Sequence, residues 1–194
     1  TFSLYKTYGP HLGLLYGKKE ILNKLPNQNH EFLNGEVPYT LNPGGPNHEE
    51  LSSLIGVYDY FNNLYKHHFP DENNSLRKKI EKINDLISNH EEKIGNLLLE
   101  YLISRNDIKL IGKNKIKNRN RAPTFAFTSN KYSSKILSNK LVENGIATRN
   151  DNFYAWRCLK ALNIDTDDGV VRASMVHYNS EEDVNKLISD LKKI

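Results

Sequence analysis

The sequence contains a single cysteine, Cys158, among 194 residues, together with one methionine and one tryptophan. One cysteine excludes an internal disulfide framework and any metal site built from several thiolates. The seven histidines do not form the short-spaced ligand sets that zinc prefers, so we predict no metal site. No apolar run approaches the roughly 18 residues of a membrane span. We therefore expect a soluble chain with a cytoplasmic location, although any targeting segment would lie upstream of Thr1.

Arginine is also scarce, because lysine supplies 20 of the 27 basic residues and arginine only seven. Lysine is dispersed along the chain and the net charge is only +4, so the composition does not indicate a continuous phosphate-binding stripe. The most basic stretch, 113–121, lies between two predicted strands. We interpret it as a solvated loop; contact with nucleic acid is the alternative, and it would show as steeply salt-dependent binding. Each arginine is a candidate for a specific role.

Apolar periodicity and turn residues predict the order of the secondary-structure elements. Before the likeliest break, at 70–74, the predicted elements are a strand over 1–5, a strand-like run over 13–16, a short helix from Lys18, and a helix after the Pro- and Gly-rich loop 38–47. After it they are a helix over 75–104, strands over 108–111, 123–128, 146–149 and 170–175, and helices over 132–144, 153–162 and 181–193. Asn47 and Gly145 are the expected N-cap and C′ residues of two of these helices. The pattern indicates an α/β protein that ends in an α+β domain.

Lys6 follows a β-type stretch and precedes Gly9-Pro10, which places it on a tight turn at the end of a strand. A lysine held in a pocket loses its charge readily and becomes a nucleophile that can form a Schiff base. A surface lysine beside a turn is the alternative, and the spacing alone favours that alternative.

A resemblance to a known family favours the pocket. The run Ser3-x-Tyr5-Lys6-x-x-Gly9-Pro10-x-x-Gly13-x-Leu15-Tyr16 resembles the segment that carries the cofactor lysine in the class V aminotransferases. These are fold-type I enzymes that depend on pyridoxal 5'-phosphate (PLP). Within the class, the run is most similar to that of the cysteine-desulfurase-like proteins. The resemblance implies that Lys6 forms the Schiff base with PLP and later moves the substrate Cα proton. It also implies that Ser3 contacts the cofactor phosphate. Tyr5 stands where the family usually has histidine, and a tyrosine can still stack and hydrogen-bond there.

A second similarity lies in the loop Pro43-Gly44-Gly45-Pro46-Asn47-His48. In related enzymes the equivalent Gly-Thr-Pro-Asn loop crosses a dimer interface and touches the neighbouring subunit's cofactor phosphate, and a Gly-rich loop before a helix N-terminus suits an anion. The resemblance therefore implies a homodimer with cofactor sites at the interface, contacted by Gly45, Asn47 and His48. Because Gly45 replaces the threonine, the contact would come from backbone N–H groups, Asn47 or His48. Taken without the resemblance, the loop is better explained as a helix-entry turn.

Arg172 stands in an otherwise apolar predicted strand, where a guanidinium is costly unless it pairs with an anion. An internal carboxylate is one such partner. However, the stretch 172–182 strongly resembles the class V signature Arg-Ala-Ser…Tyr-Asn-Thr-x-Glu-Glu, with Ser180 in place of threonine. The resemblance implies that Arg172 binds the α-carboxylate of an amino-acid substrate through its fork of N–H donors, and that Arg149 is a second contact.

The run 145–149 is similar to a Gly-Ile…Arg run of the desulfurases, whose persulfide-forming cysteine follows five residues after the arginine. That position is Tyr154 here, and the only cysteine, Cys158, comes four residues later. On a helix over 153–162 these two residues would share a face, but we interpret Cys158 as a packed structural thiol. Desulfurase chemistry is therefore not expected, and transamination, epimerisation and elimination remain.

The resemblance extends along the whole chain, but family chains are considerably longer. It implies the C-terminal half of a fold-type I enzyme, consisting of the end of the large PLP-binding domain (1–70), a connecting helix (71–104) and the small domain (105–194). We expect a PLP-dependent transferase or lyase that acts on an amino acid and is incomplete as this fragment. The alternative is a non-catalytic α/β interaction module that keeps the fold, and a basic nucleic-acid binder is a further one.

Overall fold

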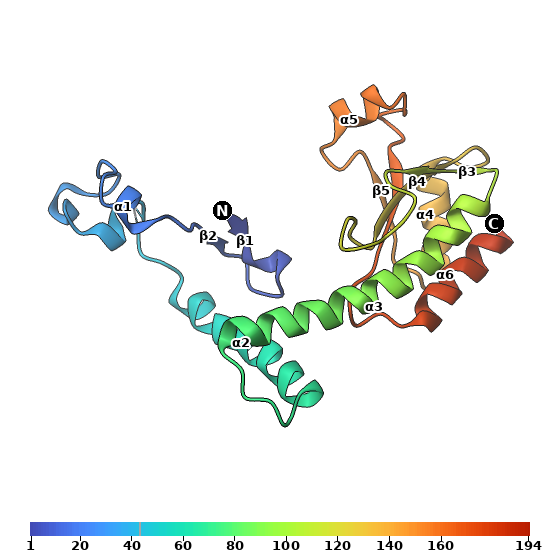
Figure 1. Cartoon of the computed structure of the whole chain (residues 1–194). Helices are drawn as coiled ribbons and strands as arrows, with labels where there is room; N and C mark the ends of the chain where they lie inside the picture. The colour runs from blue at the N-terminus through green and yellow to red at the C-terminus, as the bar shows by residue number, and fades with distance from the viewer. Residues whose placement is uncertain (43) are drawn as a thin grey trace. The chain divides into compact units, whose positions relative to one another are not determined.

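The computed structural model describes residues 1–42 and 44–194; Pro43, in the loop predicted over 38–47, lies outside the described residues. The chain forms two compact units, Thr1–Ile83 and Asn84–Ile194. The boundary between them falls within the long helix α3 (Leu76–Ser104), which confirms the helix predicted over 75–104 (Figure 1).

The first unit opens with a two-stranded antiparallel ribbon of β1 (Phe2–Ser3) and β2 (Gly13–Leu14). The strand predicted over 1–5 is too long, because it ends at Ser3 and a 3-10 turn, η1 (Leu4–Lys6), follows. The backbone N–H groups of the residues at 7 and 9 both donate to the Leu4 carbonyl, at 2.8 and 2.9 Å. These two bonds fold the chain back on itself after η1 and return it toward β2.

The rest of the first unit is mostly helical. A short α1 (Lys19–Leu22) confirms the helix expected near Lys18, and two 3-10 turns, η2 (Glu31–Leu33) and η3 (Val37–Tyr39), precede the long α2 (His48–His68). Asn47 caps α2 as predicted, since its Oδ1 accepts the N–H of Glu50 at 2.9 Å.

The turn from α2 into α3 is organised around Tyr65, which is only 2% exposed. The Tyr65 hydroxyl accepts a hydrogen bond from Asn74 Nδ2 at 2.7 Å and donates to the Glu72 carbonyl at 3.3 Å. The Glu72 carboxylate also pairs with Lys82 at 2.5 Å. These contacts explain why the break predicted at 70–74 is a defined turn.

The first unit has almost no core of its own. Among its described side chains only Leu4, Thr40, Tyr65 and Ile83 are buried. Large apolar side chains are exposed instead, and they include Phe2, Tyr5, Tyr8, Tyr16, Phe32 and Ile55. None of the helices in the described part of the chain combines the length and the apolarity that crossing a bilayer requires.

The second unit is built on a four-stranded antiparallel sheet in the order β3-β4-β6-β5. The strands are β3 (Ile108–Ile111), β4 (Thr124–Ser129), β5 (Arg149–Asp151) and β6 (Val170–Ser174), and the helices that follow α3 are α4 (Ser134–Glu143), α5 (Trp156–Ala161) and α6 (Glu181–Lys193). This mixture of helices with a sheet confirms the predicted fold class. The short α5 lies apart from α4 and α6, beyond the end of β5 (Figure 1).

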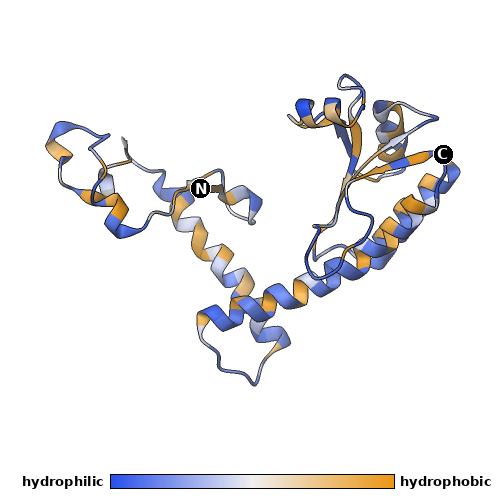
Figure 2. Ribbon diagram, turned by 45° about the horizontal axis from the view of Figure 1, so that its top comes forward, coloured by the Kyte–Doolittle hydropathy of each residue, from blue (hydrophilic) through white to orange (hydrophobic). Residues whose placement is uncertain are grey.

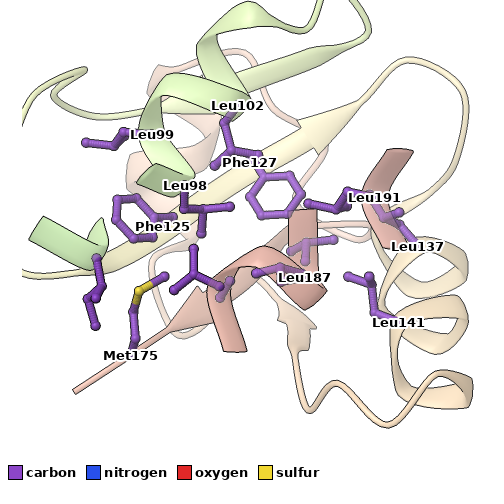
Figure 3. Close-up of a cluster of buried hydrophobic side chains, with 14 of the residues drawn as sticks. Leu98, Leu99, Leu102, Phe125, Phe127, Leu137, Leu141, Met175, Leu187 and Leu191 are labelled. Carbon is purple, nitrogen blue, oxygen red and sulfur yellow. The ribbon is translucent and has the colours of Figure 1, made fainter. Parts of the chain in front are cut away.

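One face of this sheet carries the hydrophobic core. Side chains alternate between the two faces of a strand, and Phe125, Phe127, Val171 and Ala173 share the covered face, each no more than 4% exposed. Leucines from three helices pack against them (Figure 3), namely Leu98, Leu99 and Leu102 of α3, Leu137 and Leu141 of α4, and Leu187 and Leu191 of α6. Blue and orange residues alternate along α3 in Figure 2, as an amphipathic helix requires.

The end of α4 explains why β5 begins later than predicted. Gly145 has φ of +76° and its N–H donates to the Val142 carbonyl at 2.8 Å, while the N–H of Ile146 donates to the Leu141 carbonyl at 3.0 Å. This is a Schellman motif with Gly145 at C′, as predicted. Because Ile146 still belongs to the helix cap, the strand predicted over 146–149 is wrong and β5 starts at Arg149.

The start of α5 also differs from the prediction. Phe153 and Tyr154 both have left-handed backbones, with φ of 51° and 62°, and residues in that conformation do not continue a right-handed helix. The helix predicted over 153–162 therefore begins only at Trp156.

Asp107, just before β3, provides a pH-dependent contribution to the stability of the second unit. Arg105 donates to both Asp107 oxygens, at 2.6 and 2.5 Å, and Lys131 lies 2.9 Å from the same carboxylate. The hydrogen bonds from Arg105, and next those from Lys131, hold the pKa of Asp107 well below its ordinary value. A carboxyl whose pKa is lower in the folded state stabilises the fold above its unfolded pKa of about 3.9 and loses that contribution as the pH falls.

We therefore expect Asp107→Asn to lower the free energy of unfolding at pH 7 and to lower it less at pH 3, where the unfolded carboxyl is already largely protonated. Urea unfolding of the wild type and the variant at the two pH values measures this difference. Asp85→Asn is the matched control, because Asp85 pairs with Arg119 at an exposed site where an ion pair contributes little at any pH. An equal loss at pH 7 and pH 3 for Asp107→Asn would contradict the assignment.

Candidate functional site

Two arginines stand opposite each other at the edge of the sheet in the second unit. Arg149 of β5 and Arg172 of β6 are direct cross-strand partners, so their side chains share one face of the sheet with Cβ atoms about 5 Å apart. Because Val171 and Ala173 point into the core, Arg172 lies on the opposite face. Like charges in this arrangement destabilise the strand pair. An anion placed between the two guanidinium groups would relieve that repulsion.

Arg172 is half-buried and has an aromatic neighbour. The carbon of its guanidinium lies 4.2 Å from the centroid of the Phe153 ring, within the range of a cation–π interaction. Within residues 1–42 and 44–194, neither Arg172 nor Arg149 makes an ion pair. The internal carboxylate that was the alternative partner of Arg172 is thus not found in the described chain.

Lys6, the last residue of η1, is exposed. Its amine lies 5.8 Å from the centroid of the Tyr5 ring, and that ring packs on His11 with centroids 4.8 Å apart. Leu4, and not Lys6, is the buried residue of the turn. The Lys6 amine forms no ion pair with any described residue. It is a free primary amine on a tightly hydrogen-bonded turn.

The turn that carries Lys6 is closely packed against its own backbone. A Cβ at Gly9 would lie 3.0 Å from the Leu4 carbonyl oxygen, so a side chain at this position would displace the turn. Ser3, three residues before Lys6, is half-buried, and no described residue hydrogen-bonds to its hydroxyl. An amine and a hydroxyl are therefore both available on this turn.

The loop before α2 is open. A Cβ added at Gly44 or Gly45 would meet nothing within 4 Å, and neither residue has a left-handed backbone, so no described residue explains why glycine stands there. Asn47 uses its Oδ1 to cap α2 and retains its Nδ2 as a donor. His48, the first residue of α2, is exposed. Acidic residues at 49 and 50 in the first turn offset part of the positive end of the helix.

Tyr154 and Cys158 do not share a helix face, because Tyr154 precedes α5 and lies in the left-handed turn. Tyr154 is fully exposed at that turn. Cys158 is exposed as well, so the interpretation of a packed structural thiol is wrong. In the described part of the chain, no group of three or more His, Cys, Asp or Glu side chains is placed to hold a metal ion.

Two further contacts could not be found from the sequence. Phe153 lies against Arg172 although 19 positions separate them, and no periodicity connects the two. His90 of α3 donates from Nε2 to the Asn179 carbonyl at 2.8 Å, 89 positions away. His177 lies in the same turn as Asn179, and its pKa is lowered first by burial and then by the charge of His90. Burial raises the pKa of Glu91, the residue after His90. The His90 bond joins α3 to the turn between β6 and α6.

Comparison with known proteins agrees with this fold. Residues 80–187 match the family model described as aminotransferase class-V. An aminotransferase-like protein of Gibberella zeae, FGM3, is 31% identical over 195 residues, which is 100% of this chain and 45% of that protein. A cysteine desulfurase of Serratia proteamaculans is 26% identical over 206 residues, again 100% of this chain and 44% of the relative.

Among solved structures, the Escherichia coli cysteine desulfurase CsdA superposes on 99% of this chain with a TM-score of 0.74 at 22% identity, and the match covers 44% of the CsdA chain. This chain thus spans less than half the length of each of these three proteins. The predicted fold, the C-terminal half of a fold-type I enzyme, agrees with that coverage. The chain belongs to the aminotransferase class-V family.

Proposed function

We propose that this chain supplies the cofactor lysine and the substrate-carboxylate site of a PLP-dependent enzyme that acts on an amino acid, as part of a larger enzyme. The observation that carries the proposal is the pair of opposed arginines, Arg149 and Arg172, which no described carboxylate neutralises. Two guanidinium groups on one sheet face suit the carboxylate that every α-amino acid presents.

The residues present fit the cofactor at the positions where they can be tested. Lys6 offers an amine that no ion pair engages, and Ser3 offers a hydroxyl three residues away on the same turn. The space in front of Gly45 is open, so its backbone N–H can reach an anion, together with Asn47 Nδ2 and the His48 ring. The first unit leaves Lys6 exposed, and the walls of its pocket would be completed in the whole enzyme.

In this proposal Lys6 holds PLP through its amine, Ser3 donates to the cofactor phosphate, and Tyr5 stacks beside it. PLP, when bound, withdraws electrons from the bonds at the substrate Cα and so makes its proton acidic. The Lys6 amine, once an incoming amino acid has taken its place, would act as the base that takes up the Cα proton. In a homodimer, Gly45, Asn47 and His48 would contact the phosphate of the PLP held by the second subunit.

Arg172 binds both oxygens of the substrate carboxylate through its fork of N–H donors, and Arg149 adds a second charge from the neighbouring strand. Bidentate binding fixes the direction in which the Cα proton points, and positioning of this kind is a large part of catalysis. Tyr154 carries a phenol where the desulfurases carry their thiol, so the chemistry is transamination, epimerisation or elimination and not persulfide transfer. Residues 1–70 belong to the large domain, 71–104 to the connecting helix and 105–194 to the small domain.

Selective capture of PLP by Lys6 tests the proposal. The chain is incubated with PLP, reduced with borohydride and digested, and the labelling of each lysine is measured by mass spectrometry. We expect Lys6 to be labelled more than Lys18, another exposed lysine of the same unit, because Lys6 has an aromatic ring beside it and a hydroxyl three residues away on a hydrogen-bonded turn. The visible absorbance of bound PLP should be lost in Lys6→Ala and kept in the control Lys18→Ala. Equal labelling of the two lysines would sink the proposal, as would absorbance that survives in Lys6→Ala.

A further inference from the structure

The turn between β5 and α5 has an unusual backbone. Phe153 and Tyr154 are consecutive residues with left-handed φ, and neither is glycine. Side-chain-bearing residues rarely adopt this conformation because Cβ approaches the following carbonyl, and they keep it only where the surrounding structure imposes it. Backbone strain of this kind is found most often at functional sites.

Asn152 holds the turn from one side. Its Oδ1 accepts the N–H of Tyr154 at 3.1 Å, its carbonyl accepts the N–H of Ala155 at 2.8 Å, and its Nδ2 donates to the Thr166 carbonyl at 3.3 Å. One side chain therefore closes the turn locally and ties it to the segment that leads into β6.

Gly169 holds the turn from the other side. A Cβ at this position would lie 2.3 Å from the carbonyl carbon of Asp151 and 2.7 Å from the backbone nitrogen of Asn152, and its φ is +70°. Only glycine permits the two segments to approach this closely. The conformation of Phe153 is thus imposed by contacts on both sides of it.

The result of this construction is the placement of the Phe153 ring 4.2 Å from the guanidinium carbon of Arg172. An unpaired guanidinium beside a like charge would otherwise turn toward solvent, since an arginine side chain has several rotatable bonds. The face of an aromatic ring attracts the cation and limits the orientations of its plane.

We propose that Phe153 is a positioning residue that holds the Arg172 guanidinium in one orientation, ready to receive both oxygens of a carboxylate. This inference rests on the proposed function, in which Arg172 binds the substrate carboxylate. Phe153 itself does not touch the carboxylate and acts only through Arg172.

The ring current of Phe153 gives a direct readout on the chain itself, without PLP. We expect the Nε–Hε resonance of Arg172, assigned by its absence in Arg172→Lys, to lie upfield of those of the other arginines. Phe153→Leu should return it to their range, whereas Phe153→Tyr, which keeps the ring, should leave it shifted. An unshifted resonance in the wild type, or one that Phe153→Leu does not move, would overturn the proposal.

Titration with L-alanine then tests the consequence for binding. The dissociation constant read from the Arg172 resonance should rise several-fold in Phe153→Leu and stay unchanged in Phe153→Tyr, because a guanidinium without a fixed orientation holds a carboxylate less often by both oxygens. Equal affinities in all three chains would refute a positioning role, and no response in the wild type would refute carboxylate binding by Arg172, on which the inference rests. Neither NMR experiment requires PLP. Failure of Lys6 to capture PLP would therefore count against the proposed function, whereas a failure in the Phe153 variants would count against the positioning role.

Discussion

Phe127→Ala is expected to lower the free energy of unfolding of the second unit by about 3–5 kcal/mol, as full truncation of a buried phenylalanine ordinarily does. Phe127 is 0% exposed and lies on β4 among leucines of α3, α4 and α6. Removing its ring leaves a cavity between the sheet and three helices that cannot all close in together. A loss of this size is a large part of the stability of a small domain.

Urea unfolding measures this loss, followed by the fluorescence of Trp156, the single tryptophan, which lies in the same unit. Thr128→Ala is the matched control, because Thr128 is the next residue on β4 and points to the opposite face of the sheet. We expect the control to cost less than about 1 kcal/mol. If both variants shifted the urea midpoint equally, the core would not lie on the face that carries Phe127.

Amide hydrogen exchange should divide the chain at the boundary between its two units. Amides of β4, β6 and α6 are expected to exchange only on global unfolding, at a free energy of about 5–15 kcal/mol. Amides before α2 are expected to exchange much faster than these, because the buried side chains there are only Leu4 and Thr40 among the described residues. Few buried contacts mean that local opening costs little.

The comparison is made by mass spectrometry of peptic peptides after exchange at neutral pH. Peptides from α2 are the internal control, since their helical hydrogen bonds and buried Tyr65 should give intermediate protection. Equal protection of the amides in η1 and in β4 would contradict the prediction, because it would show that the first unit is as stable as the second.

The sequence predicted most elements of the second unit because their boundaries are encoded locally. Ser180 and Asp183 form a reciprocal capping box that starts α6 at the predicted residue, and Gly145 ends α4 through its left-handed backbone. Both signals lie within a few positions of the boundary that they set. The motifs that indicate the family are also short runs of sequence, so they can be recognised without the structure.

The remaining features depend on contacts that no local pattern contains. β5 is short because Ile146 is still bound to Leu141, and α5 starts late because Asn152 and Gly169 impose a left-handed turn. The spacing around Lys6 favours a surface lysine, which agrees with its exposure, but it does not show whether another surface covers Lys6 in the whole enzyme. Burial depends on which surfaces meet in three dimensions, and no sequence pattern around Lys6 contains that information.

The alternation along β6 has a consequence for how this segment tolerates change. Val171 and Ala173 are inserted in the core, whereas Arg172 between them faces Arg149 on the other side of the sheet. Loss or gain of one residue upstream in this strand would exchange the two faces, sending a guanidinium into the leucine cluster and valine to the face that carries Arg149. A substitution in β6 affects either the core or the face that carries the arginines, according to its position. An insertion or deletion affects both faces at once, so the length of this strand should be its most strictly preserved property.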